Sequence, residues 1–243
     1  MTKVKRIILI VIATICCIAV LTGATICSLQ PDSSTCERVD VVVKDSTERQ
    51  YVSATELEYY LKSQKLYCQG HAMESIDCHV IEQALLKHKM IRTATCYKNP
   101  FGAVQVRVTQ RVPVLCVKGR SEVYLVDMDR NIMPYPKCGT VDVPVFTGSV
   151  TKSVATTEYY DFVMWLKGNS YWSKRIKSVY VKSSNYLVLS QEDHDAKIIL
   201  GRLDDYENKL DRLRTLYKKG FEKVGYPECR ELDLRFDGQV VKR

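Results

Sequence analysis

The stretch VQVRVTQRVPV, residues 104–114, decides the fold. It contains the clearest strand pattern of the chain, and the sequence pattern changes at its end. Valine at positions 104, 106 and 108 alternates with polar residues, which is the period of a strand with one buried face. After Pro113 short β-rich runs dominate the chain. We therefore expect two structural units that meet near residue 111.

The N-terminal side of this stretch, residues 36–111, is predicted to form a small α+β unit. Ser53 and Glu56 form a capping box that starts the first helix, and Gly102 allows a chain reversal before the valine-rich strand. The predicted strand, helix, helix, strand and strand lie at residues 37–45, 53–64, 77–88, 92–98 and 104–109. This order predicts a three-stranded sheet with both helices on one face.

The C-terminal side, residues 112–243, is predicted to be β-rich with flanking helices. The expected strands lie at residues 114–118, 122–126, 178–181, 186–190, 197–200, 230–236 and 239–242. One helix is expected around residues 157–167. An apolar stripe at helical spacing predicts a second helix over residues 203–219, with Gly220 as the residue that ends it. Asp237-Gly238 is a hairpin-type dipeptide between the last two strands.

An uncharged apolar run precedes both units and predicts a transmembrane helix at residues 7–27. Basic residues flank only its N-terminal side, at Lys3, Lys5 and Arg6. The positive-inside rule then places the tail at 1–6 in the cytoplasm and everything after the linker at 28–35 outside it. A cleaved signal peptide is the alternative, but no small-x-small cleavage site follows the run before Leu29.

The charge and the cysteine content limit the functions that the chain can have. The net charge is +8, and three of the basic residues lie in the N-terminal tail, so the rest of the chain carries only a mild excess and no basic stripe typical of nucleic-acid binding. The predicted exported part has an odd number of cysteines, at positions 36, 68, 78, 96, 116, 138 and 229. Disulfides and simple burial of the thiols both stay open, because spacing does not define pairing.

Motifs for chemistry are weak. The strongest metal candidate is the set Cys68, His71, Cys78 and His79, in which adjacent residues at the start of a helix point about 100° apart. Asp193-His194-Asp195 lies between two predicted strands, where a polar turn is the simpler interpretation than an acid–base site. We therefore predict no catalytic residues, no metal and no cofactor, and a protein that works by binding.

Several motifs resemble the FtsQ/DivIB family of bacterial division proteins, in the version typical of Bacteroidetes-type bacteria. Residues 76–94 resemble the second helix and following strand of a POTRA domain, and residues 108–114 resemble its joint to the family's β domain. The ending LDLRFDGQVV, residues 232–241, is the most specific match. In the turn after Asp127 many relatives have glycine, and here Asn131 is the candidate for the left-handed conformation.

The resemblance implies a non-enzymatic scaffold of the division septum that helps control peptidoglycan synthesis. It implies an inner-membrane protein with its C-terminal domain in the periplasm, and FtsL-like and FtsB/DivIC-like bitopic proteins as partners. Mapped onto the Asp-Leu-Arg motif, the implied partner-binding residues are Phe236, Gly238, Gln239 and Val240. Two alternatives are another POTRA-bearing assembly factor for exported proteins and a membrane-tethered cell-wall enzyme.

Overall fold

The computed structural model describes residues 12, 14–18, 35–46, 50–137, 140–183, 186–225 and 229–243. Within these ranges no helix combines the length and the hydrophobicity that a membrane crossing requires. The tail at 1–6 and most of the predicted span at 7–27 lie outside the described residues. The transmembrane helix therefore stays a prediction.

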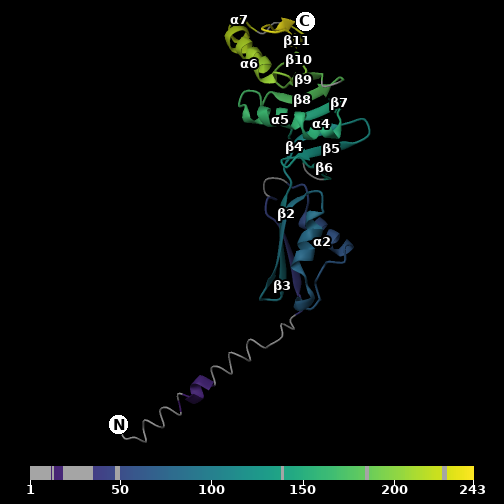
Figure 1. The fold of residues 1–243 in the computed structure, drawn as a ribbon, viewed down its shortest axis with the longest axis vertical. Coiled ribbons are helices and arrows are strands. Elements are labelled where there is room, and N and C mark those ends of the chain that lie inside the picture. The colour runs from purple at the N-terminus through teal and green to yellow at the C-terminus, as the bar shows by residue number, and fades with distance from the viewer. Residues whose placement is uncertain are drawn as a thin grey trace, which may run out of the picture.

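The N-terminal unit follows the predicted order of elements (Figure 1). Its elements are β1 (Arg38–Val43), α2 (Ala54–Ser63), the short helix η1 (Met73–Ser75), α3 (Cys78–Leu86), β2 (Ile91–Asn99) and β3 (Ala103–Gln110). The sheet order is β1-β3-β2, with β3 parallel to β1 and antiparallel to β2. The predicted mixed α+β unit with a three-stranded sheet is confirmed.

Local sequence explains these elements. Ser53 Oγ accepts the N–H of Glu56 at 3.1 Å, which caps α2, and Asp77 caps α3 by accepting the N–H groups of His79 and Val80. On β3 the alternating valines are fully buried while Arg107 is exposed, so the helices cover one face of the sheet only. Gly102 has φ +75°, the left-handed conformation expected in the turn between β2 and β3.

A polar network surrounds the joint between the two units. The Arg111 N–H donates to the Met90 carbonyl, and its guanidinium lies 2.6 Å from the buried Asp127 carboxylate. Asp127 also accepts the N–H of Asp129 and the N–H and side-chain amide of Asn131. Arg130, not Asn131, takes the left-handed conformation with φ +62°. The prediction for Asn131 is wrong because its side chain and N–H both bind Asp127, and Arg130 makes the reversal instead.

The C-terminal unit is built on one nine-stranded sheet. Its strands are β4 (Pro113–Lys118), β5 (Val123–Asp127), β6 (Ile132–Pro134), β7 (Val145–Gly148), β8 (Ile176–Val181), β9 (Leu187–Gln191), β10 (Lys197–Gly201), β11 (Glu231–Asp233) and β12 (Val241–Lys242). The sheet order is β12-β11-β10-β9-β8-β7-β4-β5-β6. The first strand formed by the unit thus lies inside the sheet, and the last strand of the chain forms one of its ends.

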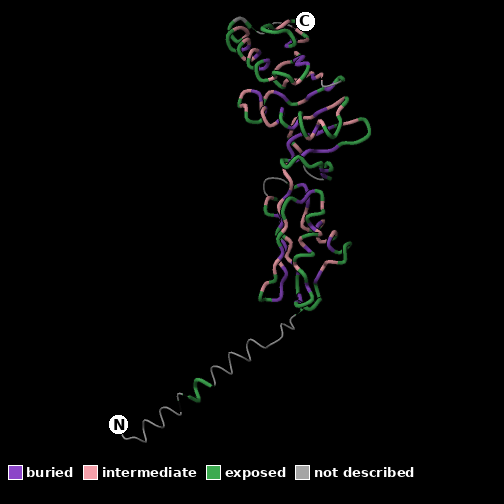
Figure 2. Tube along the Cα trace, viewed as in Figure 1, coloured by how far each residue is buried: buried purple, intermediate pink, exposed green. Residues whose placement is uncertain are grey.

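Helices pack on this sheet through apolar and aromatic residues. They are α4 (Lys152–Thr156), α5 (Glu158–Gly168), α6 (Tyr206–Leu216) and the π-helical turn η2 (Tyr217–Phe221), and the short helix α7 (Glu222–Val224) follows η2. Phe146 on β7 stacks on Tyr159 of α5 with ring centroids 5.0 Å apart, and the core is purple in Figure 2. The prediction that Gly220 ends the late helix is wrong, because Gly220 lies inside η2. The helical segment ends at α7, and Gly225, with φ +89°, follows it.

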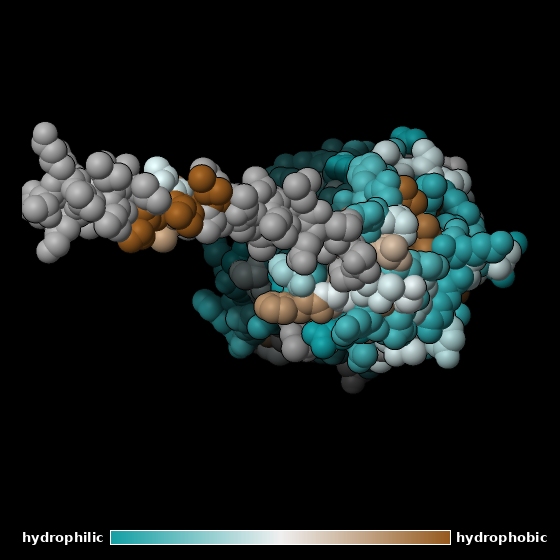
Figure 3. All heavy atoms as spheres, turned by 90° about the horizontal axis from the view of Figure 1, so that it is seen from below, coloured by the Kyte–Doolittle hydropathy of each residue, from teal (hydrophilic) through white to brown (hydrophobic). Residues whose placement is uncertain are grey.

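The described surface is mostly hydrophilic when the molecule is viewed from its N-terminal end (Figure 3). The described apolar residues of the N-terminal segment, Ile12, Ile15 and Ile18, are all more than half exposed. The C-terminus lies at the opposite end of the molecule, at the β12 end of the nine-stranded sheet (Figure 1). The last strand is therefore far from the point where the chain enters the N-terminal unit.

Candidate partner-binding edge

The end of the sheet formed by β12 is the candidate site. β12 pairs only with β11 among the described strands, antiparallel, with Leu232 opposite Lys242 and Asp233 opposite Val241. Arg243 and Glu231 exchange both of their backbone hydrogen bonds, at 3.0 and 3.1 Å. Because bonded and non-bonded pairs alternate along an antiparallel ladder, the Lys242 N–H and C=O point away from β11. They form an open edge.

The four predicted partner-binding residues lie beside this edge and not on it. Phe236 and Gly238 lie in the turn between β11 and β12, where Phe236 is 45% exposed and Gly238 has φ +68°. The Gln239 N–H closes the turn by donating to the Phe236 carbonyl at 3.3 Å. Val240 directly precedes β12 and packs partly on the core. Asp237-Gly238 thus makes the predicted reversal.

The two terminal strands are shorter than predicted. The predicted strands at 230–236 and 239–242 reduce to Glu231–Asp233 and Val241–Lys242. Leu234 still continues the pairing with β10, since its N–H donates to the Ile199 carbonyl at 2.9 Å. Beyond it the chain turns away, because Arg235 is held by the side chain of Asp233 and cannot extend the ladder. The open edge is therefore only a few residues long.

Charged residues hold the terminal turn in place. The guanidinium of Arg235 donates two hydrogen bonds to the buried Asp233 carboxylate, at 2.9 and 2.7 Å, and Arg243 contacts the same group at 3.1 Å. The hydrogen bond from Arg235 holds the pKa of Asp233 below its usual value, against the effect of burial. From α6, Arg212 donates to the carbonyls of Leu234 and Phe236 at 3.1 and 3.2 Å. The turn is thus braced from the helix and from the strand.

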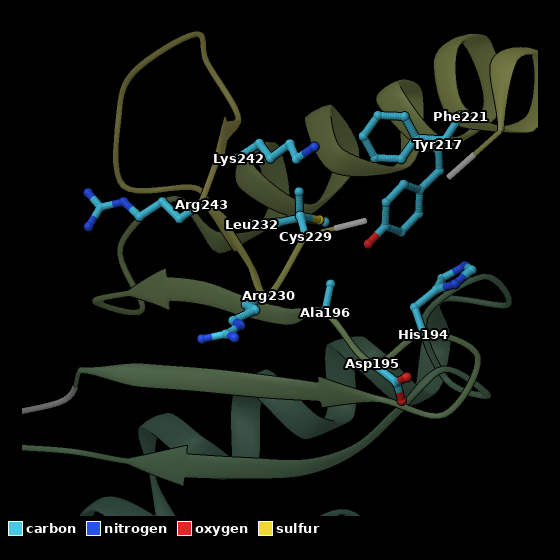
Figure 4. Close-up of a pocket in the computed structure, with 10 residues that line it drawn as sticks. All are labelled: His194, Asp195, Ala196, Tyr217, Phe221, Cys229, Arg230, Leu232, Lys242 and Arg243. Atoms are coloured by element: carbon cyan, nitrogen blue, oxygen red, sulfur yellow. The ribbon is translucent and has the colours of Figure 1, made fainter. Parts of the chain in front are cut away.

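A groove of about 630 Å³ lies next to β12 (Figure 4). Its apolar part comes from Tyr217 and Phe221 on η2 and Leu232 on β11. The basic residues Arg230, Lys242 and Arg243 also line it, with the side chains of Arg230 and Arg243 pointing away from the two aromatic rings. Tyr217 is almost fully buried, and its hydroxyl lies 3.1 Å from Gln191 Oε1. The groove offers an apolar floor with basic groups around it.

Sequence reasoning missed these groove residues. Tyr217 lies within the helix predicted over residues 203–219, but Phe221 lies beyond the expected end of that helix at Gly220. A direct signal in the sequence is the basic pair Lys242-Arg243, which begins in the last predicted strand. The sequence does not give the order of the strands in the sheet, so it does not predict that η2 lies beside the last strand.

The other candidate sites do not assemble. In the described part of the chain no group of three or more His, Cys, Asp or Glu residues has metal-binding geometry. Cys68 is buried in the apolar cluster of the N-terminal unit, and His79 is largely exposed beside Glu82. Asp193-His194-Asp195 forms the polar connection between β9 and β10, where Asp193 pairs with Arg175 at 3.1 Å.

The fold and the site together define a two-domain protein in which a POTRA-like unit is joined to a β-rich unit with an open terminal strand. Comparison with known families agrees with this description. Residues 34–109 match the POTRA-like domain, and residues 112–242, more than half of the chain, match the family described as "FtsQ/DivIB, C-terminal related". The chain belongs to the FtsQ/DivIB family. No curated protein matches it.

Membership in this family associates the chain with bacterial cell division, and the family is generally non-enzymatic. The two matched ranges lie on either side of the joint at Arg111, where the polar network links the units. The partner-binding residues inferred from the terminal motif stay a prediction.

Proposed function

We propose that this protein is a membrane-anchored scaffold of the division septum. Its C-terminal unit, outside the cytoplasm, joins FtsL-like and FtsB/DivIC-like bitopic proteins and thereby helps control septal peptidoglycan synthesis. The single observation that carries this proposal is the open edge of β12. A strand whose outer N–H and C=O groups are unpaired in the described structure is a template for a partner strand.

Charge and shape beside the edge define the partner segment. Arg230, Lys242 and Arg243 line the groove and make its rim basic, while Asp195 is the acidic residue in the lining. The floor is aromatic and aliphatic, and exposed Phe236 projects from the adjacent turn. The fitting partner is an extended segment with alternating apolar residues and an acidic side chain, since strand addition combines backbone hydrogen bonds with side-chain pockets.

The location of the edge is consistent with a partner that rises from the same membrane. The predicted anchor precedes the N-terminal unit, and β12 lies at the far end of the molecule (Figure 1). A bitopic partner must therefore extend along the whole folded part before it reaches β12. The proposal explains why the joint between the two units is braced, because a loose joint leaves the distance from membrane to edge undefined.

Two substitutions at one position test the proposal. Lys242→Pro removes the outward N–H, whereas Lys242→Ala removes the side chain and keeps the N–H. We measure the affinity of the full chain in detergent for the FtsB/DivIC-like protein of the same organism. Lys242→Pro should weaken binding about tenfold or more, the equivalent of one lost hydrogen bond, and Lys242→Ala should weaken it less.

Circular dichroism of both variants checks that the fold is kept. Equal affinities for Lys242→Pro, Lys242→Ala and the parent chain in folded protein place the interface elsewhere.

The proposed membrane topology has a separate test. External protease should digest the C-terminal unit in spheroplasts, and protection of that unit contradicts the proposed orientation.

A further inference from the structure

Four cysteines of the N-terminal unit lie in one apolar cluster, although they come from four different segments. Cys36 precedes β1, Cys68 follows α2, Cys78 begins α3 and Cys96 lies on β2. Cys36, Cys68 and Cys96 are buried, with at most 7% of each residue exposed, and Cys78 is half-buried. Neither the family membership nor the partner site accounts for this cluster.

Cys36 and Cys68 form the first pair. The Cys36 N–H donates to the His71 carbonyl and its C=O accepts the Gly70 N–H, both at 2.8 Å, while the preceding Thr35 forms an antiparallel bridge with Ala72. This local ladder places Cys36 beside the loop that begins at Cys68. The Cys68 carbonyl accepts the His71 N–H at 3.1 Å, and the Cys36 thiol donates to the Arg38 carbonyl at 3.2 Å. The loop of residues 68–71 therefore holds Cys68 close to Cys36 inside the apolar cluster.

Cys78 and Cys96 form the second pair. Cys78 and Glu82 are four residues apart on α3 and share one helix face. The Cys96 N–H donates to Glu82 Oε1 at 2.7 Å, which fixes β2 against that face of α3. Cys96 is buried in the apolar cluster that Cys78 packs against, and after burial the neighbouring Cys78 thiol is the next cause of the raised pKa of Cys96. Both pairs thus join segments that backbone or side-chain contacts hold independently.

We propose that the exported protein carries two disulfides, Cys36–Cys68 and Cys78–Cys96, which cross-link the N-terminal unit. The inference rests on the proposed topology, because disulfides persist outside the reducing cytoplasm. In each bond two thiols lose two protons and two electrons. The electrons pass by exchange to the disulfide of an extracytoplasmic thiol oxidant, which becomes a dithiol.

Burial decides when the bonds form. Burial raises the pKa of the Cys68 thiol to about 12 and that of the Cys96 thiol still further, so in the folded reduced chain the reactive thiolates are rare. Exchange must therefore take place while the unit folds. The first bond ties the chain's entry point beside β1 to the loop before η1, and the second ties α3 to β2. Tension from a membrane anchor then acts on a cross-linked domain.

The full chain, produced with its N-terminal segment in a bacterium with an oxidising periplasm, tests the inference. Cells are denatured in N-ethylmaleimide to trap free thiols, and peptides are mapped by mass spectrometry. We expect the four cysteines to be unalkylated and linked as 36–68 and 78–96. Alkylation at all four positions, linkage in any other pairing, or a stoichiometric zinc released with four free thiols overturns the inference.

Protease accessibility in spheroplasts from the same culture separates this inference from the proposed function. If the protease digests the C-terminal unit and all four thiols are alkylated, the disulfide inference alone is overturned. If the C-terminal unit is protected, the proposed topology is contradicted as well. A stability measurement adds a matched control. Dithiothreitol should lower the Tm of the purified full chain by on the order of 10 °C. This decrease in Tm should be smaller in the double variant Cys36→Ala, Cys68→Ala. It should be unchanged in Cys116→Ala, because Cys116 is a buried cysteine outside both pairs.

Discussion

The nine-stranded sheet ends in two short strands, β6 and β12, which have opposite surroundings. At the β6 end, fully buried Met133 belongs to the same apolar cluster as Leu85 and Ile91 of the N-terminal unit. At the β12 end, Val241 is half-buried and Lys242 is exposed. One end of the sheet is thus part of a joint between units, and the other faces solvent.

The sequences of the two strands explain this difference. β6 contains Pro134 and is followed by Pro136, and proline offers no N–H to a further strand, so this edge is blunted. The last 15 residues of the chain, which include β12, contain no proline. One sheet thus has a closed end at the joint between the units and an open end at β12.

Loss of the joint's buried ion pair should have the largest effect. Arg111→Ala leaves the Asp127 carboxylate, whose side chain is 1% exposed, without its cationic partner. We expect the free energy of unfolding to fall by about 3 kcal/mol, measured by urea denaturation of the full chain in detergent. Arg92→Ala is the control, because its pair with Asp129 is exposed and should contribute less than about 1 kcal/mol. Equal losses for the two variants contradict a joint centred on Asp127.

The exposed phenylalanine beside β12 should have the next largest effect, on binding. Phe236→Ala should reduce affinity for the FtsB/DivIC-like partner by on the order of 2 kcal/mol if the ring enters the interface. Phe101→Ala makes the same chemical change in the N-terminal unit, where Phe101 is 83% exposed, and should leave affinity unchanged. Titration calorimetry compares the two, and a loss confined to Phe101→Ala reverses the assignment.

Acid should destabilise the β12 end through Asp233, and this effect should be the smallest. Its pKa is lowered in the folded state, so its stabilising contribution is present above the unfolded pKa and is lost as pH falls through the folded value. Asp233→Asn should therefore have a flatter dependence of Tm on pH below about 4 than the parent chain. Parallel curves for the two proteins show that Asp233 contributes nothing to acid sensitivity.

Local signals in the sequence predicted the N-terminal unit well, because its helices carry caps and β3 alternates strictly. The late helix was predicted to stop at Gly220, but η2 passes through that glycine, so Phe221 was not placed at the groove. The Asp237-Gly238 dipeptide did predict the turn that contains Phe236 and Gly238. The register that turns Lys242 outward was not, since it depends on backbone pairing with β11.

The central claim is that partners dock on the β12 edge and not on the β6 edge. A photo-crosslinking amino acid placed at Lys242 or at Ile132, one on each end strand, tests it in living cells, with products identified by mass spectrometry. Both positions are exposed, at 38% for Ile132. We predict a crosslink to an FtsB/DivIC-like protein from position 242 and none from position 132. A crosslink to that protein from 132 alone, or from neither position in correctly localised protein, contradicts the account.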